Sequence, residues 1–190
     1  MSDSKTTAMS NITLIGMPGA GKSTLGVVLA KKLGYSFVDT DLLLQEGTGK
    51  LLSEILTEEG VEGFIQQENA LLAGLECQRH VIATGGSAVY SEDGMRHLKS
   101  LGTVLFIEVE LEELLKRLSP DLLERGVVMR GNNTTIGQLY DERMPLYRRY
   151  ADITVNTTGL PMLASIEKLY AALGDMVSDE PGQPEGGADV

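Results

Sequence analysis

The stretch GMPGAGKST, residues 16–24, constrains the fold of this chain more than any other part of its sequence. It fits the pattern G-x-x-x-x-G-K-[S/T], it follows a short apolar run at residues 12–15, and a helical pattern begins at Lys22. The glycines let the backbone bend so that its N–H groups can point at phosphate oxygens, and the positive end of the helix strengthens that attraction. The sequence therefore predicts a strand, a phosphate-binding loop and a helix in succession.

The rest of the chain alternates between short apolar runs and segments with helical spacing. The expected strands are residues 12–15, 36–38, 80–83, 104–108 and 153–155, and the expected helices are residues 22–33, 51–56, 63–76, 92–101, 111–118, 136–147 and 161–173. Alternation of this kind predicts an α/β fold with a parallel sheet and helices on both faces. A length of 190 residues is typical of one domain.

The formal net charge of −11 argues against nucleic acid as a main partner, because a phosphate backbone requires a basic surface. A small anionic ligand needs only a local basic pocket. Cys77 is the only cysteine, so we expect no disulfide within the chain. His80 and His97 are the only histidines, and their spacing is not that of metal ligands, so we expect no structural zinc site. The N-terminus has no signal-peptide pattern and no apolar run is long enough to span a bilayer, so we expect a cytoplasmic protein without membrane contact.

The two ends of the sequence differ from its middle. Residues 176–190 are rich in proline, glycine and acidic residues and contain no basic residue, and residues 1–10 are polar, so we expect disordered tails there. This leaves a single domain at residues 11–175. Within it, residues 119–133 are irregular and contain arginines and two glycines, a composition that suits a mobile lid.

The phosphate-binding pattern predicts a nucleoside triphosphate ligand. We expect Gly16, Gly19, Ala20, Gly21, Lys22, Ser23 and Thr24 to hold it, with the Lys22 charge at the outer phosphates and the Ser23 hydroxyl on Mg²⁺. The alternative is a glycine turn with a solvated lysine. A GTPase switch would contain an N-K-x-D motif, which this sequence lacks, and motors are usually larger. A kinase of small molecules or nucleotides fits the length.

Polar and glycine residues follow two further strands. Asp39 and Asp41 come after the second strand, where alternation aims both carboxylates similarly; one can organise Mg²⁺ and the other can act as a general base. The alternative is that Asp41 is only a helix N-cap. Gly85 and Gly86 follow the third strand and would let a ligand approach the backbone, although an ordinary turn is an equal alternative.

Four motifs in order, GMPGAGKST, FVDTD, ATGG and ERMPLYRRYAD, resemble those of the shikimate kinase family over residues 11–173. The resemblance implies a P-loop kinase fold of the nucleoside monophosphate kinase type, with five parallel strands, flanking helices and a lid. It implies a monomeric ATP- and Mg²⁺-dependent enzyme of aromatic amino-acid biosynthesis that phosphorylates a ring hydroxyl. The resemblance implies that Lys22, Asp41 and Arg125 are catalytic and that Ser23 and Asp39 bind the metal. It implies that the substrate is bound by Asp41, Gly85, Gly86 and Arg143. Arg117 and Arg125 would bind the nucleotide. Arg117 has an alternative as an ion-pair partner of Glu113, and Arg148 and Arg149 are expected at a solvated helix end.

The sequence departs from the family pattern at the acceptor site. The family has a Phe-Arg pair whose arginine grips the shikimate carboxylate, whereas this chain has Phe64 and Ile65; the third glycine of a triplet is Ser87. Loss of one charge-assisted hydrogen bond costs roughly 1.5–3 kcal/mol, and only Gln66 lies beside Ile65 as a neutral donor. The resemblance still makes shikimate the leading single acceptor, although this loss weakens the binding expected for its carboxylate. Other small alcohols such as homoserine or gluconate, a nucleotide acceptor, and a non-catalytic nucleotide-binding module are the alternatives.

Overall fold

In the computed structural model, which describes residues 11–118, 127–129 and 134–174, the chain folds around a five-stranded, fully parallel sheet. The strand order is β2-β3-β1-β4-β5. The strands are β1 (Asn11–Ile15), β2 (Ser36–Asp39), β3 (His80–Ala83), β4 (Gly102–Glu108) and β5 (Ile153–Asn156). The helices are α1 (Lys22–Leu33), α2 (Thr40–Thr48), α3 (Leu52–Ala73), the 3-10 helix η1 (Ala88–Tyr90), α4 (Glu92–Leu101), α5 (Leu111–Arg117), α7 (Ile136–Tyr150) and α8 (Met162–Leu173).

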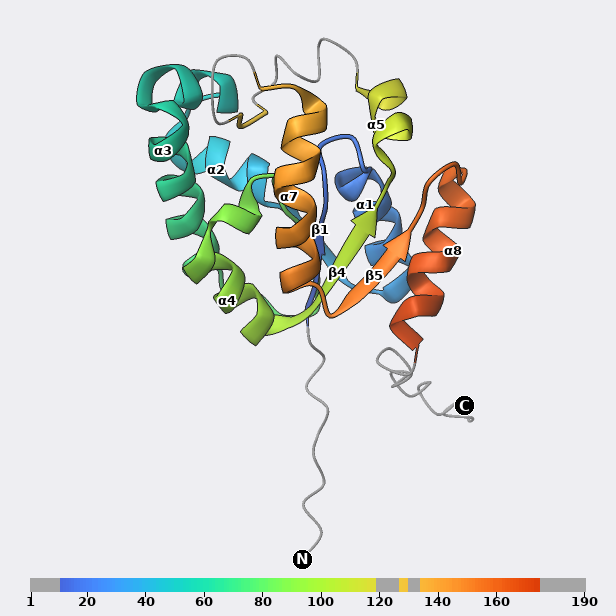
Figure 1. Cartoon of the computed structure of the whole chain (residues 1–190). Helices are drawn as coiled ribbons and strands as arrows, with labels where there is room; N and C mark the ends of the chain where they lie inside the picture. Colours follow the sequence, from blue (N-terminus) through green and yellow to red (C-terminus); the bar gives the residue numbers. More distant parts are fainter. Residues whose placement is uncertain (1–10, 119–126, 130–133, 175–190) are drawn as a thin grey trace, which may run out of the picture.

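The helices cover both faces of the sheet (Figure 1). Helices α1 and α8 pack against each other on one face, while α4 and α7 lie across the other. Every residue of β1 is buried, as expected for a central strand of a parallel sheet. All five predicted strands and the three-layer α/β arrangement are confirmed.

The core is apolar and close-packed around the central strands. The Phe106 ring of β4 stacks on the Tyr147 ring of α7, with 5.1 Å between ring centroids. A second, smaller group, here called the α2–α3 cluster, joins α2, α3 and the short segment 127–129, and consists of Leu44, Ile55, Phe64, Ile65 and Val128. This cluster holds α2 and α3 beside the carboxyl edge of the sheet.

The two helical segments expected at residues 51–56 and 63–76 are confirmed as the two parts of α3, which are separated by a break in backbone geometry at Gly60 (φ 71°, ψ −176°). Glycine reaches this left-handed region without steric cost, so the chain bends there and hydrogen bonding resumes on the other side. The gap between the two predicted segments contains this break.

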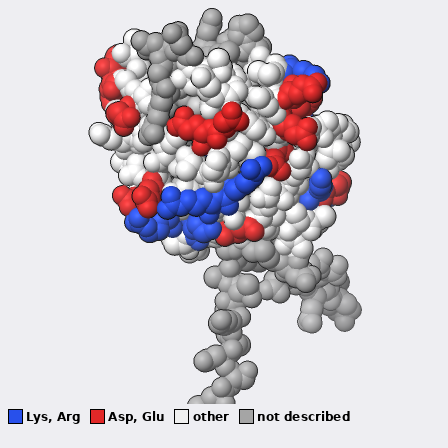
Figure 2. Space-filling view, viewed as in Figure 1, with Lys and Arg blue, Asp and Glu red and all other residues white. Residues whose placement is uncertain are grey.

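Charged side chains of opposite sign lie together on the face shown in Figure 2. Lys99 contacts Asp152 at 2.6 Å, Arg148 contacts Glu108 at 2.9 Å, and Arg149 approaches Glu92 at 3.8 Å. The prediction that Arg148 and Arg149 end a solvated helix is confirmed, because both side chains are largely exposed. These exposed pairs contribute little to stability.

Within the described ranges, no helix combines the length and the apolar character needed to cross a bilayer. The tails expected at residues 1–10 and 176–190 lie outside the described residues, as does most of the lid expected at residues 119–133.

Candidate active site

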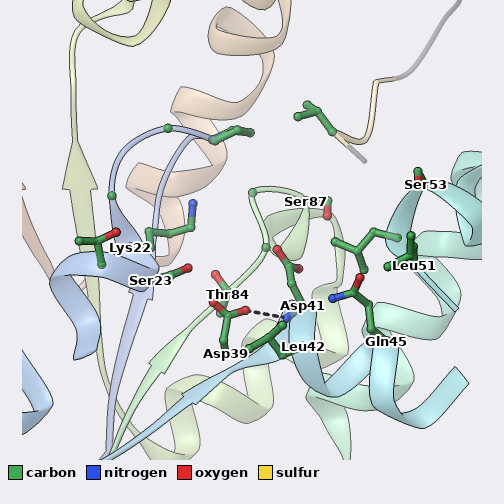
Figure 3. Close-up of a pocket in the computed structure, with 18 of the residues that line it drawn as sticks. Lys22, Ser23, Asp39, Asp41, Leu42, Gln45, Leu51, Ser53, Thr84 and Ser87 are labelled. Atoms are coloured by element: carbon green, nitrogen blue, oxygen red, sulfur yellow. Dashed lines mark hydrogen bonds between the residues drawn. The ribbon is translucent and has the colours of Figure 1, made fainter. Parts of the chain in front are cut away.

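A pocket of about 970 Å³ lies at the carboxyl edge of the sheet, where the phosphate-binding loop, α2, α3 and the loop after β3 meet. In Figure 3, Lys22 from α1, Asp41 from α2 and Ser87 from the loop after β3 lie around it. A ligand crevice at this edge is the usual position in open α/β sheets. The lining includes Pro18, Gly19, Gly21, Lys22, Ser23, Thr24, Asp39, Asp41, Leu42, Gln45, Leu51, Leu52, Phe64, Thr84, Gly85, Gly86, Ser87, Arg117 and Val127.

The phosphate-binding loop has the backbone geometry that its glycines were expected to provide. Gly16, Gly19 and Gly21 all have positive φ angles of 149°, 80° and 93°. A Cβ atom at Gly16 would lie 2.6 Å from the Ile107 carbonyl oxygen, so the loop could not pack here with a larger residue. The Ala20 amide donates to the Met17 carbonyl at 3.1 Å, which assigns Ala20 to the turn itself.

Lys22 is buried at the start of α1, inside the loop. Its Nζ atom donates to the carbonyl oxygens of Gly16 at 2.8 Å and Met17 at 3.0 Å. Burial lowers its pKa from 10.5 to about 8, and the nearby Asp41 carboxylate opposes that shift. The Lys22 amine therefore lies in a low-dielectric environment at the N-terminus of α1, where its charge would interact strongly with a bound anion.

Asp39 and Asp41 have different roles in α2. The Asp39 carboxylate caps the helix, because its Oδ1 atom accepts a hydrogen bond from the Asp41 amide at 3.0 Å. The alternative in which Asp41 is the N-cap is therefore wrong: the helix begins at Thr40, and Asp41 lies in its first turn. The pKa of Asp41 is raised to about 6, chiefly by burial and also by the Asp39 charge, while the charge of Lys22 partly opposes both. Both carboxylates line the pocket, as predicted.

Neighbouring side chains approach the backbone of Gly85 and Gly86 so closely that only glycine fits at these two positions. A Cβ atom at Gly85 would lie 2.6 Å from Asp41 Oδ1 and 2.7 Å from Glu68 Oε1. At Gly86, it would lie 2.8 Å from Pro18 Cδ and 2.9 Å from Arg143 Nη1. The alternative of an ordinary turn does not explain this crowding. Asp41 lines the pocket together with the two glycines, whereas Glu68 and Arg143 are outside the lining and pack behind Gly85 and Gly86.

Arg143 is fully buried on α7, against the wall formed by Gly86. Its Nη2 atom donates to the Val128 carbonyl at 2.6 Å, its Nε atom donates to the Tyr90 hydroxyl at 3.2 Å, and its guanidinium lies 5.1 Å from the centre of the Tyr90 ring. The Tyr90 hydroxyl in turn donates to Glu142 Oε1 at 2.9 Å. These contacts fix the guanidinium plane and direct Nη1 toward Gly86.

Glu68 is a charged residue of this region that sequence reasoning missed. It lies on α3 with 2% of its surface exposed, and burial raises its pKa to about 8, with Asp41 adding to that shift. The hydroxyl of Ser87 faces its carboxyl group and lowers the pKa in part, followed by Arg143 and Lys22. The available signal was its position on the apolar stripe of α3, four residues after Phe64 and four before Leu72.

The two arginines expected on the nucleotide have different outcomes. Arg117 lines the pocket at the end of α5, and its Nε atom also contacts Glu113 Oε1 at 3.0 Å, so the ion pair expected as an alternative is present. Arg125 lies outside the described residues. Of the expected lid, Val127 lines the pocket and Val128 is buried in the α2–α3 cluster.

The two departures from the family pattern border the acceptor side. Ile65 has 8% of its surface exposed and belongs to the α2–α3 cluster. Gln66 is exposed to solvent and is outside the pocket lining, so it does not replace an arginine there. Ser87 is buried and lines the pocket.

Comparison with known proteins gives consistent matches to one family. The family model described as shikimate kinase matches residues 18–174. A shikimate kinase from Francisella tularensis subsp. novicida is 37% identical over 165 residues, which span 86% of this chain and 94% of that protein. One from Vibrio parahaemolyticus is 41% identical over 149 residues, spanning 77% of this chain and 86% of that protein.

Solved structures agree with the sequence matches. A shikimate kinase from Acinetobacter baumannii in complex with shikimate aligns with a TM-score of 0.77 and 32% identity, covering 85% of this chain and 91% of that one. A thymidylate kinase from Candida albicans aligns with a TM-score of 0.51 at 15% identity, over 87% of this chain and 91% of that one. The second match shows a shared fold alone, which is the fold class predicted from the sequence.

Proposed function

The chain belongs to the shikimate kinase family, and from this premise we propose that it transfers the γ-phosphoryl group of ATP to a hydroxyl group of a small metabolite. The observation that supports this most directly is the presence in one pocket of a phosphate-binding lysine, Lys22, and a buried carboxylate, Asp41, whose pKa is about 6. A base with a pKa near the working pH suits proton removal from a hydroxyl.

On the nucleotide side, bound Mg²⁺·ATP supplies the phosphoryl group and the metal charge that its transfer requires. The loop amides and Lys22 are suited to hold the phosphates, and Ser23 and Thr24 are exposed at the same edge. The Ser23 hydroxyl and the Asp39 carboxylate line the pocket and are all-oxygen donors, which Mg²⁺ prefers. Arg117 and Arg125 remain the proposed nucleotide-side arginines.

On the acceptor side, Asp41 takes the proton of the attacking hydroxyl. The bond between that oxygen and the γ-phosphorus forms while the bond from the phosphorus to the ADP oxygen breaks, so ADP leaves with the electron pair. Gly85 and Gly86 let the acceptor approach the backbone, and Arg143 holds its carboxylate. Because these groups are fixed before the reaction, positioning and charge neutralisation supply most of the acceleration.

Shikimate is the leading single acceptor, because the relatives that resemble this chain over most of its length are named shikimate kinases. A specific observation favours a second candidate, another small alcohol such as homoserine or gluconate: Ile65 is buried in an apolar cluster where the family pattern has a carboxylate-binding arginine. We further propose that the enzyme is a cytoplasmic monomer, in keeping with a small-molecule substrate.

The test is ADP release from Mg²⁺·ATP by the purified protein with shikimate, homoserine, gluconate and nucleoside monophosphates in parallel. We expect turnover of at least one alcohol and its loss in a Lys22→Met variant, which controls for contaminating kinases. Turnover of nucleoside monophosphates alone would make the protein a nucleotide kinase. ATP binding without transfer to any acceptor would make it a non-catalytic module and end the proposal.

A further inference from the structure

Glu68 is a buried carboxyl group beside the acceptor pocket that the proposed chemistry leaves unused. Neither of its oxygen atoms forms a well-aligned hydrogen bond to a described residue, and only 2% of the residue is exposed. Its Oε1 atom and Asp41 Oδ1 both lie less than 3 Å from the point where a Gly85 side chain would begin. Two carboxyl groups therefore converge on the same wall of the pocket. Buried groups of this kind are expensive unless something pairs with them.

The protein offers Glu68 little compensating charge. The charged groups that act on it are Asp41, which disfavours its ionised form, and Arg143 and Lys22, which favour it. Arg143 already donates to Val128 and Tyr90, and Lys22 to two loop carbonyls. One helical turn before Glu68, where a cation on α3 would reach the same face, the chain has Ile65, packed in the α2–α3 cluster.

Ser87 connects this carboxyl group to the pocket. Its residue lines the pocket, and its hydroxyl faces the Glu68 carboxyl. Figure 3 shows Ser87 and Asp41 among the side chains that line the pocket. A hydroxyl can accept a hydrogen bond from a ligand while it donates one to a carboxylate. The Ser87 hydroxyl can thus link a hydrogen-bond donor of a ligand in the pocket to the Glu68 carboxylate. A glycine at this position has no side chain to make that link.

We propose that Glu68, acting with Ser87, makes the acceptor pocket selective for a hydroxylated carboxylic acid that also carries a protonated amine, that is, for a hydroxy amino acid. The acceptor then brings the cation that Ile65 does not provide. Its ammonium group lies between Asp41 and Ser87 in the field of Glu68, its carboxylate is held by Arg143, and its hydroxyl faces Asp41. This inference rests on the proposed phosphoryl transfer, and of the two candidate acceptors named above it favours the second, a hydroxy amino acid such as homoserine, over shikimate.

Matched acceptors isolate the amine. Homoserine and 4-hydroxybutanoate differ only in the α-amino group, as do serine and 3-hydroxypropanoate. We expect kcat/KM to be about 10- to 150-fold higher for the better aminated acceptor than for its partner, the value of one charge-assisted hydrogen bond. Equal turnover of the two members of each pair, or turnover of shikimate alone, would overturn the inference and leave the proposed function standing. Absence of turnover with every acceptor would refute both.

Variants then assign the effect to Glu68. In Glu68→Gln, which keeps the shape and removes the charge, we expect the ratio between aminated and plain acceptor to fall by at least about tenfold, and in Ser87→Gly by a similar factor. Glu62→Gln, an exposed change of the same kind on the same helix, should keep the wild-type ratio. An unchanged ratio in Glu68→Gln would overturn the proposal, and ATP affinity in each variant verifies that it is folded.

Calorimetry gives a readout that does not depend on turnover. Binding an ammonium beside Glu68 stabilises its ionised form, so an enzyme that carries a proton there at pH 7 must release it. Titrations of homoserine in buffers with different ionisation enthalpies should therefore show a larger net proton release by the wild-type protein than by Glu68→Gln, in which only neighbours such as Asp41 and Lys22 respond. The same proton release in both proteins would contradict the assignment.

Discussion

The Asp41 amide donates a hydrogen bond to the carboxylate of Asp39, with 3.0 Å between N and Oδ1. This contact gives two similar residues different roles. One carboxylate oxygen of Asp39 caps α2, whereas the Asp41 carboxylate does not take part in capping and lines the pocket. The division also explains their electrostatics, because the fixed Asp39 charge helps to hold the pKa of Asp41 near 6.

Replacing Asp41 by asparagine should remove the proposed general base while keeping the shape of the site. We expect kcat to fall by about 100-fold or more, the usual contribution of a positioned base, with ATP affinity nearly unchanged. Steady-state kinetics and nucleotide titration measure the two effects separately. Asp141→Asn, an exposed change on α7, is the control. Near-normal turnover in Asp41→Asn would return this residue to a structural role.

The pH dependence of kcat should follow the ionisation of Asp41. The base is active only when it has lost its proton, so kcat should be constant above a pH of about 7 and fall tenfold per pH unit below about 6. The measurement is kcat between pH 5 and 8 at saturating Mg²⁺·ATP and acceptor. A kcat that stays constant down to pH 5 would show that the pKa of Asp41 keeps its ordinary value near 4 and that burial does not raise it.

Glu68 should make the folded protein less stable as the pH rises. Its pKa is about 8 in the folded state and ordinarily 4.5, so the unfolded chain loses this proton first and stability declines between those values. At pH 7 the cost in folding free energy is roughly 3–4 kcal/mol, because pH 7 is well above the ordinary pKa and each pH unit of separation costs about 1.4 kcal/mol. Denaturant unfolding should show Glu68→Gln to be more stable than the wild type at pH 8 and similar at pH 5. An equal difference in unfolding free energy between the two proteins at pH 5 and pH 8 would show that ionisation of Glu68 is not its cause.

Tyr90 should act on the acceptor through Arg143. Tyr90→Phe keeps the ring under the guanidinium and removes the hydroxyl that accepts from Nε at 3.2 Å. We expect KM for the acceptor to rise about 2- to 12-fold, the range for one hydrogen bond, while kcat and the KM for ATP stay the same. Tyr170→Phe, on the surface of α8, serves as the comparison. A change in the KM for ATP would indicate general damage.

Gly85 should tolerate no side chain. A methyl group there would meet Asp41 Oδ1 and Glu68 Oε1 at 2.6 and 2.7 Å, so Gly85→Ala should lower kcat/KM by on the order of 10- to 100-fold. Gly47→Ala is a matched change on α2, where a Cβ meets nothing within 4 Å, and should keep full activity. Full activity in Gly85→Ala would mean that the two carboxyl groups do not converge at this wall.

Local patterns were sufficient for the strands, most helices and the phosphate-binding loop. Residues 16–24 specify their own conformation, because glycine backbone freedom and the following helix depend on neighbours in the chain. The resemblance to the family likewise placed Asp41, Gly85, Gly86 and Arg143 in one region. The burial of Glu68 could not be predicted in this way, since it depends on residues of other elements that pack around α3.

The sequence by itself determined that this chain builds a parallel α/β sheet with a phosphate-binding loop, because strand and helix periodicities and a glycine-rich turn are properties of adjacent residues. Only the tertiary structure decided what surrounds the acceptor. Glu68, Ser87 and Asp41 come from separate elements, and they meet only once β3 pairs between β2 and β1. The physical reason is that burial and charge, which set the pKa values and the selectivity proposed here, depend on neighbours far apart in the chain.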